Sequence, residues 1–121
     1  MAGRAEFALP HVLAVLTAEE SARAAVYLDD DVRQPGVVHA GAMTVEVSEP
    51  KLLLFVDGKP GVNWTHACRY LLLDIGSGEI TSIAADMPPA HGPLPSSWCL
   101  LWQAPGTEPW RLLPLASRDS A

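Results

Sequence analysis

Residues 51–85 read "KLLLFVDGKPGVNWTHACRYLLLDIGSGEITSIAA", and this stretch carries the clearest pattern of strands in the chain. It holds three apolar runs, 51–57, 63–74 and 80–85, which are separated by turns that contain glycine or proline. The second turn, "IGSGE", is short and glycine-rich, as a hairpin requires. The stretch therefore predicts consecutive antiparallel strands, of which 63–74 is the longest.

The sequence on both sides of this stretch predicts more strands. "AMTVEV" (42–47) alternates between apolar and polar residues, and "WCLLWQ" (98–103) and "WRLLPL" (110–115) follow a proline-rich loop. Near the start of the chain, "LPHVLAVL" (9–16) is brief and rich in branched residues, so we expect a buried strand there as well.

One helix is expected among these strands. Thr17 and Glu20 have the spacing of a capping box, and "EESARAAVYL" (19–28) is good helix material. The residues expected to face the core are Ala22, Ala25, Val26 and Leu28. Asp29-Asp30-Asp31 would then be the solvated end of this helix or, alternatively, a site for a metal or a basic partner.

These elements predict an α+β domain, with one N-terminal helix packed on a mostly antiparallel, curved β-sheet of about 5–7 short strands. A chain of 121 residues, 49% of them hydrophobic, can bury a substantial core. We expect a single domain over residues 7–116, with tails at 1–6 and 117–121.

Charge and composition exclude several kinds of partner. The net charge is −6 and the basic residues are scattered singly, which argues against nucleic-acid binding. The apolar stretch 7–16 is too short to span a bilayer and makes a poor secretion signal, so we expect no membrane association.

Cys68 and Cys99 are expected to stay reduced in a cytoplasmic setting. The excess of Arg over Lys and the abundance of Ala suggest a GC-rich bacterial source.

The candidate site residues come from two strands. On a strand over 63–74, alternate residues share one face, and they either fill the core or form the floor of a ligand pocket. On 98–103, two tryptophans flank Leu100 on one face, where they either fill the core or contact a partner. The ligand or interface candidates are Trp64, His66, Cys68, Tyr70, Trp98 and Trp102.

Catalytic and metal-binding motifs find little support. His66 and Cys68 could begin a zinc site, but its remaining ligands would have to be His91 and Cys99, which have no signature spacing. A Cys–His nucleophile needs a third group from another segment, and no phosphate-binding loop or nucleophile elbow is present. The sequence therefore predicts no cofactor and leaves catalysis unsupported.

The segments "LPHVLAVLTAEESARAAVYLDD" and "GAMTVEVSEPKLLLFVDGKP" together resemble the opening βαβββ module of vicinal oxygen chelate proteins. That family includes glyoxalases, ring-cleaving dioxygenases and antibiotic-sequestering resistance proteins. The resemblance implies a divalent metal held by His11, His66 and a carboxylate, either Glu46 or Asp57. It ends near residue 60, because "IGSGEITSIAADMPP" predicts a turn, a strand and a loop where the second module needs a helix.

Two classes of function follow. The first is a non-catalytic interaction or ligand-binding protein, such as an inhibitor, an immunity-type protein or an assembly factor, whose partner is a protein or a small molecule. Small size, acidity, four tryptophans and missing catalytic motifs favour it, and a homodimer is compatible with it. The alternative is a small metal-dependent enzyme or antibiotic-binding protein that uses His11 and His66.

Overall fold

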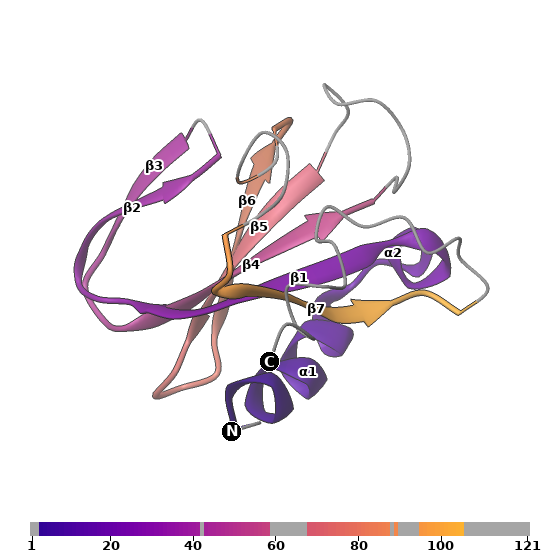
Figure 1. Ribbon diagram of the computed structural model, residues 1–121, viewed down its shortest axis with the longest axis horizontal. Coiled ribbons are helices and arrows are strands. Elements are labelled where there is room, and N and C mark those ends of the chain that lie inside the picture. Colours follow the sequence, from indigo (N-terminus) through magenta and orange to yellow (C-terminus); the bar gives the residue numbers. More distant parts are fainter. Residues whose placement is uncertain (1–2, 42, 59–67, 88, 90–94, 106–121) are drawn as a thin grey trace.

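The computed structural model describes residues 3–41, 43–58, 68–87, 89 and 95–105. Within them, five strands form an antiparallel sheet in the order β6-β5-β4-β1-β7, and two more form a separate hairpin (Figure 1). The elements are α1 (Gly3–Val15), α2 (Ala18–Arg23), β1 (Ala25–Arg33), β2 (Gly36–Ala40), β3 (Met43–Val47), β4 (Lys51–Asp57), β5 (Cys68–Asp74), β6 (Ile80–Ala85) and β7 (Trp98–Gln103). The predicted α+β class, helical at the N-terminus with an antiparallel sheet, is confirmed.

The sheet is covered on both faces. The helices pack on one face, and the buried side chains there are Ala8, Val12, Ala24, Val26, Leu28, Leu52, Leu54, Val56, Leu71 and Leu73. The β2–β3 hairpin packs on the other, over a core of Ala25, Tyr27, Val38, Ala40, Val47, Leu53, Phe55, Tyr70, Leu72 and Trp98. Alternate residues of β4, β5 and the first half of β1 enter the two cores, which is why these segments are mostly apolar.

A glycine brings the hairpin tip onto the sheet. Gly41 has a φ of +65°, and a Cβ there would lie 3.0 Å from the Tyr70 hydroxyl oxygen and 3.2 Å from the Met87 carbonyl oxygen. The Tyr70 hydroxyl donates a hydrogen bond of 2.8 Å to that same carbonyl. A larger residue at this position would therefore push the hairpin away from the sheet.

The strand predicted over residues 9–16 is wrong, because this segment belongs to α1. Ala8 and Val12 are buried, and Ala5 and Leu16 pack beside them, so the buried positions recur every three or four residues as in a helix. The eight-residue run 9–16 includes only two of these four positions, too few to reveal the period. Pro10 lies inside the helix on its exposed side. A proline costs a helix least on its exposed side, where water can replace the hydrogen bond that its missing N–H would have made.

The helix predicted over residues 19–28 is wrong in its second half. The capping box of Thr17 and Glu20 is confirmed, but α2 ends at Arg23 and Ala24 is already extended. Ala25, Val26 and Leu28 are buried as strand residues of β1, whereas α2, which includes Ala22, buries no residue. A run that is apolar on both faces of a strand cannot be told from a buried helix by its periodicity.

The acidic triplet lies on β1 rather than at a helix end. The register shifts between Asp29 and Arg33, so the strand bulges over these residues. Asp29 is buried, forms a 2.7 Å ion pair with Arg33 and accepts a hydrogen bond from the Asp31 amide. Asp30 pairs with Arg4 of α1 at 3.5 Å. The triplet therefore closes a bulge and anchors the first helix.

A second bulge places Trp98 and Trp102 on opposite faces, which corrects the prediction that they share one. Val26 pairs with Trp102 while Tyr27 pairs with Leu100, so β7 has one extra residue at this point. Trp98 and Leu100 pack beside the hairpin, whereas Trp102 packs on the helix side.

The predicted strand over 110–115 and residues 63–67 lie outside the described residues. In the described part of the chain, no helix is long and apolar enough to cross a membrane.

Candidate functional site

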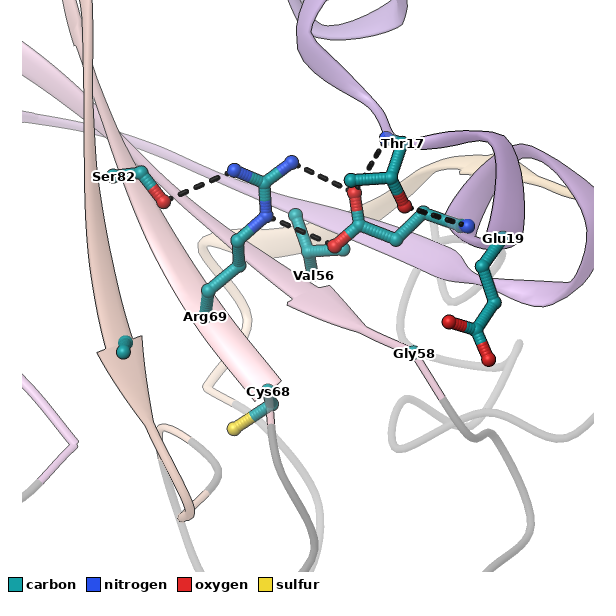
Figure 2. A pocket seen from close by; sticks show the side chains of 9 residues that line it. Thr17, Glu19, Val56, Gly58, Cys68, Arg69 and Ser82 are labelled. Atoms are coloured by element: carbon teal, nitrogen blue, oxygen red, sulfur yellow. Dashed lines mark hydrogen bonds and ion pairs between the residues drawn. The ribbon is translucent and has the colours of Figure 1, made fainter.

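A pocket of about 360 Å³ lies at one end of the sheet, between α2 and the ends of three strands (Figure 2). The residues that line it are Thr17, Glu19, Glu20, Val56, Gly58, Cys68, Arg69, Ser82 and Ala84. The two polar side chains at its centre, Glu20 and Arg69, are held by several hydrogen bonds each. These bonds decide which groups remain to meet a ligand.

Arg69 joins the helical layer to the sheet. Its Nε and one terminal nitrogen donate to the two carboxylate oxygens of Glu20, at 2.9 and 2.7 Å. The same terminal nitrogen also donates to the Val15 carbonyl at the end of α1, and the other donates to the Ser82 hydroxyl at 3.0 Å. Figure 2 shows the guanidinium lying between Ser82 and Thr17. With four of its five N–H donors engaged in these bonds, Arg69 acts mainly as part of the pocket wall.

Glu20 serves the helix cap and the ion pair together. One carboxylate oxygen accepts from the Thr17 amide at 2.9 Å, while the Thr17 hydroxyl accepts from the Glu20 amide at 3.0 Å. Burial acts to raise the pKa of Glu20, but the hydrogen bonds from Arg69 and Thr17 outweigh it and hold the pKa below its ordinary value. Glu20 is therefore an anion in the folded protein.

Cys68 does not have the properties of a nucleophile. Its side chain points away from Arg69 in Figure 2, and its thiol approaches the Met87 carbonyl at 3.7 Å. Burial, followed by the carboxylates of Asp57 and Asp86, raises the pKa of the Cys68 thiol to about 11. Because only the thiolate attacks or binds metal well, this thiol is inert near neutral pH.

The edge of the sheet beside this pocket is formed by β6. The pairing of β5 with β6 is regular from Cys68–Ala85 to Leu73–Ile80, and no described segment pairs with the other side of β6. The strand reads "ITSIAA", without charge or proline. Natural edge strands usually carry charges, prolines or bulges that prevent further pairing, and β6 has none of these.

A second pocket lies on the other face of β6. It has a volume of about 320 Å³ and is lined by Met43, Ala84, Ala85 and Asp86. Ala84 lines this pocket and the first one, so the end of β6 has a hollow on each face. Met43, at the tip of the hairpin, is 48% exposed and gives this pocket an apolar wall.

Two of the sequence-predicted candidates, Tyr70 and Trp98, meet at a third pocket of about 260 Å³ under the hairpin. The buried Asp29, its partly exposed partner Arg33 and His39 also line it. Tyr70 and Trp98 are both buried in the core cluster on this face, so they pack the floor and offer a ligand little surface.

The remaining candidates are not brought together. Trp64 and His66 lie outside the described residues, and Trp102 packs on the helix face. The ring of His11 contacts that of Phe7 at an angle of 54°, with centroids 4.9 Å apart, and packs on Gly78, while Glu46 is exposed on β3. Across the residues that the structure describes, no group of three His, Cys, Asp or Glu side chains could hold a metal. The first strand of the module implied by the resemblance is a helix here.

A scan against protein-family models, a search of curated proteins and a search of solved structures find no match to this chain. Its function must therefore be argued from the geometry of its own residues.

Sequence reasoning missed the features that make the end of β6 distinctive. Glu20 and Arg69 are separated by 49 positions, and no local pattern links them. The run 80–85 was correctly predicted as a strand, and its lack of charge was a usable signal of an open edge. What the pattern did not contain was the order of the strands.

Proposed function

We propose that this protein is a non-catalytic interaction protein that binds an extended segment of a partner by pairing it with the outer edge of β6. The observation that carries the proposal is the coincidence of an uncharged, regular edge strand with a pocket on each of its faces at Ala84. In strand addition, backbone hydrogen bonds supply affinity and pockets for alternate side chains supply specificity. The end of β6 offers both.

The opposite edge of the sheet is less suited to this role. β7 is also uncharged, but a bulge between its pairs with Val26 and Tyr27 interrupts its regular pairing. Bulges at edge strands twist the edge away from a straight partner. β6 has no such interruption over Ile80–Ala85. We therefore assign the docking edge to β6.

Two further properties support a non-catalytic, cytoplasmic role. The inert Cys68 thiol removes the sequence's best nucleophile from consideration. Cys68 and Cys99 are not joined by a disulfide and pack on opposite faces of the sheet, in keeping with a reducing compartment. We place the interaction in the cytoplasm on this ground.

The test uses a capped, ten-residue peptide of alternating Thr and Val as a neutral strand probe. We expect it to protect the amides of β6 from hydrogen exchange in the full-length protein. The variant Ala84→Trp places a large side chain in the first pocket, on the face shared with Arg69, and should strongly reduce this protection. Val37→Trp, at a position 64% exposed on the outer face of the hairpin, is the matched control and should bind as the parent does. Equal binding by all three proteins, or protection confined to other strands, would show the assignment to be wrong.

A further inference from the structure

The surroundings of β6 are acidic, and this bears on which segment would pair with it. Glu79 precedes the strand and Asp86 follows it, and both are exposed. At the Ala84 end, the first pocket adds Glu19 and Glu20 against the single cation of Arg69, and Arg69 is already paired with Glu20. The described residues that frame this edge therefore present an excess of negative charge.

Two observations show that this charge lies close to the edge. Glu19 has 76% of its side-chain surface exposed, and its contact with Arg23 is a loose one of 3.7 Å. The carboxylates of Asp57 and Asp86 both raise the pKa of the Cys68 thiol. The backbone of Cys68 pairs with that of Ala85 in β6. Each of the two pockets at Ala84 therefore has an exposed carboxylate in its lining, Glu19 in the first and Asp86 in the second.

We propose that the segment bound by β6 is basic, with Lys or Arg side chains alternating with apolar ones, and this inference rests on the proposed function. In a strand laid along β6, successive side chains point to opposite faces of the sheet. The face with Glu19 accepts the basic side chains, and the face with Met43 and Ala85 accepts the apolar ones, with Asp86 at its rim.

A second copy of this chain is a poorer occupant. A two-fold antiparallel pairing centred on β6 would place Ile80 opposite Ala85 of the other copy. One step further out, it would place Glu79 directly opposite Asp86. Like charges in directly opposed positions destabilise a sheet, and each copy carries a net charge of −6. A basic segment removes this repulsion.

The experiment compares three capped ten-residue peptides in which Val alternates with Lys, Thr or Glu, at 50 and 500 mM salt. We expect the Lys peptide to bind about 3- to 10-fold more tightly than the Thr peptide at low salt, as two exposed ion pairs would allow. The advantage should shrink at high salt, because screening weakens exposed pairs. Exchange protection at β6 locates each peptide.

Single-charge variants identify the carboxylates responsible. Glu19→Gln should reduce the preference for the Lys peptide most, and Asp86→Asn, at the rim of the apolar face, should reduce it less, whereas Glu46→Gln, an exposed acid on β3, should leave it unchanged. If the Thr and Lys peptides protect β6 equally well, strand addition stands and the basic preference is wrong. If no peptide protects β6, the proposed function fails and the preference with it. Dimerisation of the free protein through β6, seen by sedimentation, would replace the basic partner with a second copy.

Discussion

Among single substitutions at the pocket, Arg69→Met should cause the largest loss of stability, because Arg69 joins the helical layer to the sheet. The substitution keeps an apolar stem but removes the guanidinium from two Glu20 oxygens, from the Val15 carbonyl and from the Ser82 hydroxyl. Arg69 and Glu20 have only 20% and 16% of their side-chain surface exposed. Water therefore replaces the lost partners poorly, and the Glu20 carboxylate remains half-buried without its cation.

The size of the loss follows from this geometry. Breaking one side of a buried ion pair costs about 3–5 kcal/mol, and the partial exposure of this pair places it near 3 kcal/mol. Glu20→Gln should cost less, about 1–2 kcal/mol, because the amide oxygen can still accept from Thr17 and from Arg69. Thr17→Ala removes the cap alone and should cost about 1 kcal/mol.

The assay is urea unfolding, monitored by tryptophan fluorescence. It is applied to the parent, to Arg69→Met, to Glu20→Gln and to the variant that combines these two substitutions. The double-mutant cycle should give a coupling of about 1–2 kcal/mol between positions 20 and 69. The difference between the parent and Arg69→Met should also depend on pH. Because the folded state lowers the pKa of Glu20, this stabilisation is complete above its ordinary value of 4.5 and is lost as the pH falls through the lower, folded value.

Two outcomes would contradict this role of Arg69. If Arg69→Met lies within about 0.5 kcal/mol of the parent, as neutral surface changes do, the guanidinium does not hold the layers together. If the coupling is absent while both single variants are destabilised, Arg69 acts through Val15 and Ser82 rather than through Glu20.

Two further predictions concern other contacts. Gly78→Ala should lower the free energy of unfolding by about 1–2 kcal/mol, because Gly78 has a φ of +81° and a Cβ there would lie 2.5 Å from His11 Cε1. In the His11→Ala background the loss should be smaller. An equal loss in both backgrounds would mean that helix α1 does not rest on this turn. Alkylation of Cys68 by iodoacetamide should be slow at pH 8 and accelerate about tenfold per pH unit toward pH 11, and the intact mass without reductant should retain both thiol hydrogens. Fast labelling of Cys68 at pH 7, or a Cys68–Cys99 disulfide, would contradict the burial and strand placement described above.

Elements whose signals are local could be predicted from the sequence alone. The strands at 51–57, 80–85 and 98–103 and the glycine-rich turn before β6 follow from apolar runs bounded by turn residues. The capping box of Thr17 and Glu20 follows from spacing, since both hydrogen bonds close within one helical turn. In each case the groups that interact are only a few residues apart, so a short window contains the whole interaction.

The secondary structure of the apolar runs 9–16 and 24–28 depends on long-range packing and could not be predicted from either run. Both are short, and both lack the contrast between a buried and a solvated face that would identify their period. The first becomes α1, because residues 5, 8, 12 and 16 meet the same face of the sheet. The second becomes β1, because the helices cover one side of it and the hairpin covers the other.

The candidate site was decided almost entirely by long-range pairing. The order β6-β5-β4-β1-β7 leaves β6 at an edge, and it brings Arg69 of β5 to Glu20 of α2 across 49 positions. Each strand forms hydrogen bonds equally well with many neighbours, so the choice among them depends on how the two cores pack around the whole sheet. That packing is a property of residues far apart in the chain, and no local pattern contains it.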